Sequence, residues 1–200
     1  MLFEAFILIG GRSSRFGSDK ALARLGSVTL AENAASILEK TEGCTDITFV
    51  AASETQFAAS EMPRNVIFDR NRSYGAWSGL ETALSASKRD LTFLLACDLP
   101  FVTPRLVESL VRRLEKDEAL AAVPIQPDGR PQPLCGVYRT TPVLGLVNAK
   151  FAGGETLPSL ISFVREIGAA MVEPKEGDRP DSFANINTRG DLEKALRSRS

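Results

Sequence analysis

The 200-residue sequence contains no histidine, and this absence narrows the chemistry that its side chains can perform. Without imidazole, Ser-His-Asp and Cys-His catalysis are excluded, and so are zinc sites built on histidine. Only three cysteines are present, and their odd number and wide spacing indicate a reducing compartment rather than a disulfide scaffold or a thiolate zinc site. The remaining carboxylates, Lys, Arg, hydroxyls and backbone amides suit phosphoryl and nucleotidyl transfer with a hard divalent cation.

Excess charge and long apolar runs are also lacking. The formal net charge is −1, so bulk electrostatics gives no reason to expect nucleic acid or an anionic membrane as a partner. Any anion must therefore be recognised locally. The first apolar run is interrupted by Glu4, has no basic region before it and is too short to span a bilayer, so it is a poor signal peptide. We expect a cytoplasmic protein that inserts no segment into a membrane.

Strands and helices are expected to alternate along most of the chain. Helical spacing of apolar residues follows several short apolar runs, and Thr103-Pro104 is a strong helix start because Thr caps and Pro suits the first turn. This alternation predicts one domain over residues 1–200 with a Rossmann-like, three-layer α/β/α fold, in which a mostly parallel sheet is covered on both faces. The main expected strands are Phe3–Ile9, Ile47–Ala51, Val66–Phe68, Leu91–Ala96, Ala119–Val123, Leu134–Tyr138 and Ala169–Val172.

The segment Gly10–Lys20 follows the first expected strand and combines glycines with the cations Arg12, Arg15 and Lys20. Glycines let backbone amides approach an anion closely, and open α/β sheets bind ligands in loops at the carboxyl ends of their strands. The segment matches neither G-x-x-x-x-G-K-[ST] nor G-x-G-x-x-G, which disfavours P-loop and dinucleotide-binding proteins. It is predicted to hold the phosphates of a nucleoside triphosphate; the alternative is a solvated basic turn.

Two aspartates, Asp69 and Asp98, follow expected strands and should lie at the same edge of a parallel sheet. A carboxylate in this place can hold Mg²⁺ between triphosphate oxygens. The alternative for each is a turn or capping Asp. Trp77, at a later helix start, could stack on a ligand, although a buried packing role is favoured. Near the end of the chain, Asn187 or Thr188 could simply cap the last helix.

Taken together, these segments resemble the molybdenum cofactor guanylyltransferases, which join GMP to molybdopterin. The similarity covers nearly the whole chain, although Ile9 replaces the usual Ala and Trp77 replaces the Leu of G-P-L-x-G. The matching family motifs are L-A-G-G-x-S-x-R-M-G-x-D-K at residues 8–20, C-D-x-P at Cys97–Pro100, P-L-x-x-x-Y at Pro133–Tyr138 and F-x-N-x-N-T-x-x-D at Phe183–Asp191.

The resemblance implies a fold of the nucleotide-diphospho-sugar transferase type and a role for each matching residue. Backbone at the start of the loop would line the guanine, Lys20 would contact the phosphates, and Asp98 would bind both the nucleotide and Mg²⁺. Mg²⁺ on Asp98, together with Lys20 and Arg15, would neutralise the triphosphate in catalysis, and Ser53 falls near a further, loosely aligned nucleotide contact. The implied nucleotide-binding residues are Leu8, Ile9, Gly10, Gly11, Lys20, Asp69 and Asp98.

The implied reaction transfers GMP from GTP to the terminal phosphate of molybdopterin and releases pyrophosphate. An ionised acceptor phosphate needs no general base, which agrees with the missing histidines. The open alternatives are use of CTP, a sugar or alcohol phosphate acceptor, and a non-catalytic nucleotide-binding regulator. The turn Gln126–Pro133, with Arg130 and Gln132, could contact the acceptor or be a hairpin tip. The family also implies transient contacts with molybdoenzymes or cofactor carriers.

Overall fold

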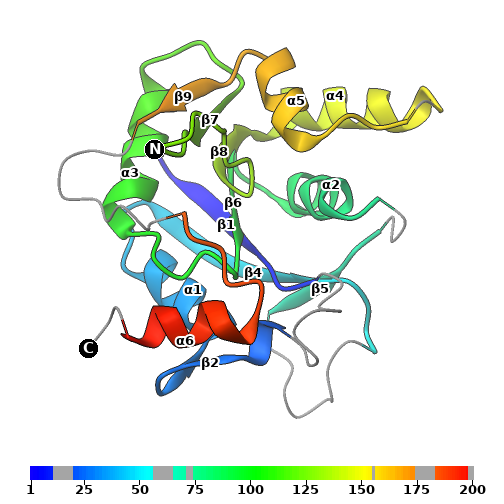
Figure 1. The fold of residues 1–200 in the computed structure, drawn as a ribbon. Coiled ribbons are helices and arrows are strands. Elements are labelled where there is room, and N and C mark those ends of the chain that lie inside the picture. The colour runs from blue at the N-terminus through cyan, green and yellow to red at the C-terminus, as the bar shows by residue number, and fades with distance from the viewer. Residues whose placement is uncertain (11–19, 56–64, 71–73, 155, 174–182, 198–200) are drawn as a thin grey trace.

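The computed structural model describes residues 1–10, 20–55, 65–70, 74–154, 156–173 and 183–197, which form a central sheet between two layers of helices (Figure 1). The sheet has seven strands in the order β5-β4-β1-β6-β8-β7-β9. Their bounds are β1 (Phe3–Leu8), β4 (Cys44–Ala51), β5 (Val66–Phe68), β6 (Leu91–Ala96), β7 (Ala121–Pro124), β8 (Cys135–Arg139) and β9 (Ala170–Val172).

The sheet is mostly parallel, as predicted. Strand β1 pairs in parallel with β4 and β6, and β5 pairs in parallel with β4. Among the described strands of this sheet, only β8 is antiparallel to its neighbours, β6 and β7. Strand β9 again pairs in parallel with β7. The carboxyl ends of β1, β4, β5 and β6 therefore meet at one edge, where open α/β sheets bind their ligands.

The helices divide between the two faces of the sheet, as Figure 1 shows. Helices α1 (Leu30–Glu39) and α3 (Pro104–Glu115) cover one face and bury Phe3 and Ile7 of β1. Helices α2 (Ala76–Ala86), α4 (Thr140–Ala152) and α5 (Leu160–Glu166) cover the other and bury Phe6 and Leu8. Alternate residues of β1 thus enter two separate cores, as the two-residue period of a strand requires.

A smaller cluster lies beside the first core, under α6 (Arg189–Arg197). It packs Ile186 and Ala195 against Leu25, Leu30 and Phe101, so it joins the end of the chain to a segment near its beginning. That early segment holds the 3₁₀ turn η1 (Lys20–Leu22) and a hairpin of β2 (Arg24–Leu25) and β3 (Val28–Thr29). In Figure 1, α6 accordingly lies beside β2 and α1.

Helix starts agree closely with the capping chemistry of the sequence. The Thr103 hydroxyl accepts from Leu106 N, and α3 begins at Pro104, as predicted. At α1, Thr29 and Glu32 form a reciprocal capping box. Helix α5 begins at Leu160, because Ser159 caps it directly after Pro158. None of the described helices has the length and apolar character needed to cross a membrane.

Candidate functional site

The chain stays tied to the sheet after β1 ends. The amides of Ile9 and Gly10 both donate to the Val50 carbonyl, at 2.9 and 3.1 Å. Gly10 then passes so close to the end of β4 that a Cβ there would lie 2.7 Å from Ala52 N. Real Cβ contacts are essentially never shorter than 3.0 Å, so this position requires glycine. The first residues of the predicted nucleotide loop are therefore held rigidly at the carboxyl edge of the sheet.

Leu8 and Ile9 turn their side chains to opposite cores. Leu8 packs with Trp77 and Leu80 of α2, and a Cβ on Gly79 would lie 2.9 Å from its Cδ2 atom. Ile9 is 4% exposed and belongs to the core on the α1 face. This core therefore accommodates the Ile9 side chain, which is larger than the Ala that is usual in the family. Contact of Leu8, Ile9 and Gly10 with a nucleobase through the backbone stays a prediction.

Lys20 and Asp98 form an ion pair at this edge. Lys20 begins η1, and Asp98 follows β6 after Cys97. The Lys20 Nζ atom donates to Asp98 Oδ2 at 2.6 Å, and the two side chains are 16% and 21% exposed. Cys97 N donates to the Leu8 carbonyl, which ties the end of β6 to the end of β1. The sequence placed both residues at one ligand-binding edge, and the structure brings their charged groups together.

Asn187 joins this pair from the far end of the chain. Its Oδ1 atom accepts from Lys20 Nζ at 2.8 Å across 167 residues of sequence. Beside it, Ile186 N donates to the Asp98 carbonyl at 3.0 Å. A capping role was predicted for Asn187 or Thr188, and Thr188 is the cap, since its hydroxyl accepts from Asp191 N. The sequence feature that could have indicated this role is that Asn187 matches the second Asn of the family motif F-x-N-x-N-T.

Asp69 lies at the same edge, at the end of β5. Its backbone N donates to the Ala51 carbonyl at 2.9 Å, and the next amide, that of Arg70, donates to the Thr82 hydroxyl of α2. Ser53, after β4, is hydrogen-bonded through its hydroxyl to Thr55 at 3.1 Å. The structure therefore places Asp69 and Ser53 at the ends of adjacent strands, as the parallel sheet predicted. Their contacts with a nucleotide stay predictions.

Three predicted residues of the loop, Gly11, Arg12 and Arg15, lie outside the described residues. The Gln126–Pro133 turn follows β7 at the carboxyl edge and is held by the amide of Gln126, which donates to the Arg130 carbonyl. The Arg130 side chain is exposed and lies 4.0 Å from Asp128. This geometry fits both an acceptor contact and a plain hairpin tip, so both alternatives stay open.

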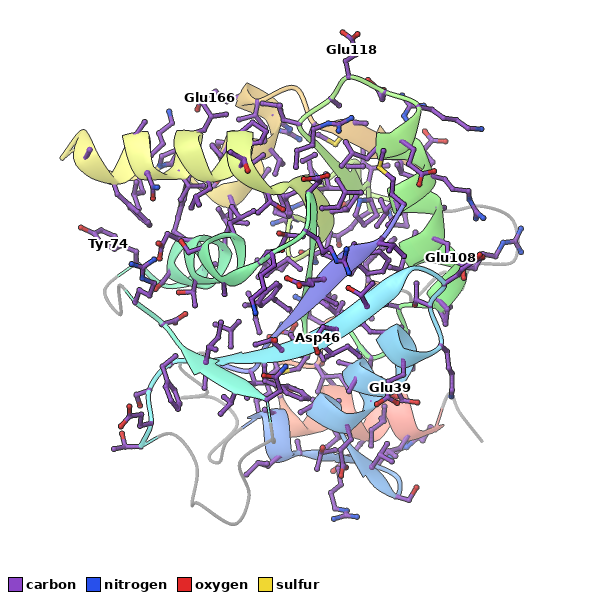
Figure 2. All side chains as sticks on the ribbon, turned by 180° about the vertical axis from the view of Figure 1, so that it is seen from behind. Glu39, Asp46, Tyr74, Glu108, Glu118 and Glu166 are labelled. Carbon is purple, nitrogen blue, oxygen red and sulfur yellow. The ribbon has the colours of Figure 1, made fainter. Side chains whose placement is uncertain are left out.

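Trp77 is a packing residue, as favoured from the sequence. It is 5% exposed, and its indole N–H donates to the Pro158 carbonyl at 2.7 Å. Its ring lies 4.7 Å from that of Phe163 between centroids. Tyr74, by contrast, is exposed, and Figure 2 shows it on the outside of the molecule near α2. The centroid of its ring lies 5.0 Å from that of Phe151.

The cysteines are not arranged for nucleophilic chemistry. Cys97 is buried in the core at the α1 face, where it acts as a small apolar side chain. Burial raises the pKa of Cys135 to about 12 and that of Cys44 to about 11, so both thiols stay protonated at neutral pH. None of the three cysteines is therefore suited to act as a nucleophile at neutral pH.

The carboxylates that the structure describes fit a cation that arrives with a triphosphate. Within the described ranges, no group of three or more His, Cys, Asp or Glu side chains is placed to hold a metal ion. Mg²⁺ is commonly bound by one or two carboxylates together with substrate phosphates rather than by an all-protein cage. Asp98 is one carboxylate that would suit such a site, and it lies in an ion pair with the Lys20 ammonium. The donor set thus fits Mg²⁺ bound jointly by the protein and the nucleotide.

Known proteins are similar to this chain in both sequence and fold. A probable molybdenum cofactor guanylyltransferase of Thermococcus kodakarensis is 30% identical over 189 residues, covering 93% of this chain and 90% of that protein. The crystal structure of molybdopterin-guanine dinucleotide biosynthesis protein A from Archaeoglobus fulgidus is 25% identical with a TM-score of 0.78, and the match covers 98% and 97% of the two chains.

The fold extends to transferases of other substrates. The structure of 2-C-methyl-D-erythritol 4-phosphate cytidylyltransferase from Thermus thermophilus has a TM-score of 0.69 at 18% identity, over 99% of this chain and 98% of that one. This likeness concerns the fold alone, which is that of nucleotide-diphospho-sugar transferases. Residues 5–167 match the family model described as the MobA-like NTP transferase domain. The chain is therefore a nucleotidyltransferase that belongs to the MobA-like NTP transferase family.

Proposed function

We propose that this chain transfers GMP from GTP to the terminal phosphate of molybdopterin, releases pyrophosphate and forms the guanine dinucleotide form of the cofactor. The names of the relatives from Thermococcus kodakarensis and Archaeoglobus fulgidus support this substrate pair. The observation that carries the proposal is the Lys20–Asp98 pair beside the rigid end of β1, which offers a cation for phosphates and a carboxylate for a metal at one edge.

In the reaction, an oxygen of the acceptor phosphate attacks the α-phosphorus of GTP and forms the new P–O bond. The bond from the α-phosphorus to the oxygen bridging to the β-phosphate breaks, and pyrophosphate leaves with that electron pair. The attacking phosphate is already ionised, so the chain needs no general base, and catalysis rests on positioning and on charge stabilisation. Lys20 neutralises the triphosphate, and the backbone of Leu8–Gly10 orients the base.

A bound Mg²⁺ would add Lewis-acid stabilisation of the phosphate oxygens, and Asp98 would hold it. Arg15 would add a further positive charge from the glycine-rich loop. Delivery of the product to a molybdoenzyme or a cofactor carrier would require transient protein contacts.

Pyrophosphate release tests the proposal when it is measured with each of the four nucleoside triphosphates and Mg²⁺, with and without molybdopterin. Release that requires both GTP and molybdopterin supports guanylyl transfer. Release with CTP would instead indicate a cytidylyltransferase. Nucleotide binding without turnover on molybdopterin or on sugar phosphates would indicate a regulator. Omission of Mg²⁺ should abolish turnover.

Substitution of the ion pair links the reaction to this site. Lys20→Met and Asp98→Asn should each lower kcat by about 10²-fold or more, the effect typical of losing one preorganised charge-stabilising group. Lys88→Met and Asp90→Asn are matched controls, because both residues are exposed and precede β6, at the opposite end of the strand that Asp98 follows. Wild-type turnover in Asp98→Asn would remove the metal assignment, and equal losses in the controls would indicate a general effect of charge.

A further inference from the structure

The segment from Phe183 to Asp191 is anchored to the body of the protein at several points. Phe183 is 6% exposed and enters the large core on the α1 face. Ile186 is 2% exposed in the cluster under α6, and its amide donates to the Asp98 carbonyl. Two buried side chains and a backbone bond thus hold the segment against the loop that carries Asp98. Asn187 directly follows the second of these anchors, Ile186.

A capping box then fixes the backbone at Asn187. Asp191 N donates to the Thr188 hydroxyl at 3.1 Å, and Thr188 N donates back to Asp191 Oδ2 at 2.9 Å. The same Oδ2 atom also accepts from Asn187 N, at 3.0 Å. An ordinary capping box satisfies one amide with each side chain. Here the Asp191 carboxylate holds two consecutive amides, and one of them belongs to the residue that contacts Lys20.

The Asn187 side chain completes the chain of contacts. Lys20 Nζ lies between Asp98 Oδ2 at 2.6 Å and Asn187 Oδ1 at 2.8 Å. An amide oxygen is a neutral acceptor, so it orients the ammonium group without placing a further negative charge beside it. The Asp98 carboxylate and the Asn187 amide oxygen thus fix the direction of the Lys20 ammonium from two sides. A lysine alone has a flexible four-carbon stem, and it gains most from such orientation.

We propose that Asp191 is a positioning residue for nucleotidyl transfer: through the backbone of Asn187 it sets the amide oxygen that orients the Lys20 ammonium beside Asp98. This inference rests on the proposed function for the identity of the reaction. It extends the site to a residue that touches neither charged group of the ion pair. The two residues of the capping box therefore have different roles. Thr188 caps the helix, whereas Asp191 both caps the helix and holds the Asn187 amide.

The first test compares the two halves of the capping box. Asp191→Ala removes the bonds to the amides of Thr188 and Asn187, and kcat/KM should fall about tenfold, since small misplacements of a catalytic group cost up to ~10²-fold. Thr188→Ala is the matched control, because it also weakens the start of α6 but leaves Asp191 Oδ2 on both amides. It should lower kcat/KM less than threefold, and Asp191→Asn, which keeps a carbonyl acceptor, should restore most of the activity. Equal losses in Asp191→Ala and Thr188→Ala would overturn the proposal, because a purely structural role of α6 predicts them.

A double-mutant cycle tests whether Asp191 acts through Asn187. In an Asn187→Ala background, Asp191→Ala should cause no further loss, because the contact that it positions is already gone. Losses that multiply in the double variant would mean that the two residues act independently, and would refute the inference. Glu193→Ala, an exposed carboxylate on the same helix, should leave kcat/KM unchanged.

A measurement on the free protein separates this inference from the proposed function. The Nζ resonance of Lys20, followed by NMR without substrates, should shift in Asp191→Ala and Asn187→Ala but not in Glu193→Ala. If these shifts appear while the wild type transfers no nucleotide to molybdopterin, the reaction is wrong and the positioning role stands. If the wild type is active and the Lys20 resonance is unchanged in Asp191→Ala, the positioning role is wrong.

Discussion

One added methyl group at Gly10 should disturb the end of β1 measurably. Its Cβ would lie 2.7 Å from Ala52 N and 3.2 Å from both Ala51 C and Ala52 Cα. These are backbone atoms that cannot rotate away, so the chain after β1 and the chain after β4 must move apart, by about 0.7 Å if the contact is to reach the ordinary 3.4 Å. Overpacking of this kind costs about 1–3 kcal/mol. At ~2–4 °C per kcal/mol for a chain of this size, Gly10→Ala should lower Tm by about 2–12 °C.

Catalysis should suffer beyond the loss of stability. The displaced backbone is that of Ile9 and Gly10, which is predicted to line the nucleobase, and a shift approaching 1 Å can cost ~10²-fold. Calorimetry and GTP titration measure the two effects separately. The control is Gly145→Ala: its Cβ would meet nothing within 4 Å inside α4, so it should stabilise the protein by about 0.5–1 kcal/mol. Unchanged Tm and KM in Gly10→Ala would refute the reasoning, because they would show that the strand ends separate freely.

Two further predictions concern titration and Trp77. Bonds from the Thr29 backbone and side chain lower the pKa of Glu32 below 4.5, and bonds from the Thr188 side chain and the Asn187 backbone lower that of Asp191 below 3.8. Each carboxylate thus stabilises the fold above its unfolded pKa and loses this contribution as the pH falls through its lowered folded pKa. Tm should therefore fall more steeply below pH 4.5 in the wild type than in Glu32→Gln, and parallel curves would contradict this. Trp77→Phe loses the bond to the Pro158 carbonyl, so it should cost about 1–2 kcal/mol in chemical denaturation and leave the nucleotide KM within about twofold. A large rise in KM would instead restore a ligand-stacking role.

Local chemistry made most of the secondary structure predictable. Thr103 and Pro104 fixed the start of α3, because a hydroxyl cap and a proline in the first turn act within one turn of helix. The hairpin of β2 and β3 was not predicted, because two-residue strands are too short to show a periodic pattern. The reversal of β8 was not predicted either, since strand direction depends on where the chain crosses the sheet.

The site was predictable only as far as topology allowed. Asp69 and Asp98 could be placed at one edge because parallel strands end together. That placement also puts Asp98 at the same edge as Lys20, although the direct ion pair between them was not predicted. The contact from Asn187 was not predictable from topology, because it depends on how the cluster containing Ile186 packs the end of the chain against the loop after β6. No local pattern reports a packing contact across 167 residues.

The long separation of Lys20 and Asn187 affects the order in which a nascent chain acquires its parts. The ribosome makes the residues of the Lys20–Asp98 pair early, and the last strand of the sheet, β9, ends at Val172. Asn187 lies 15 residues beyond the end of β9, after every described strand of the sheet. A chain that ended between Val172 and Asn187 would contain all of these strands, whereas Lys20 would lack the Asn187 acceptor. In the order of synthesis, the strands of the scaffold thus come first and the residue that orients Lys20 comes last.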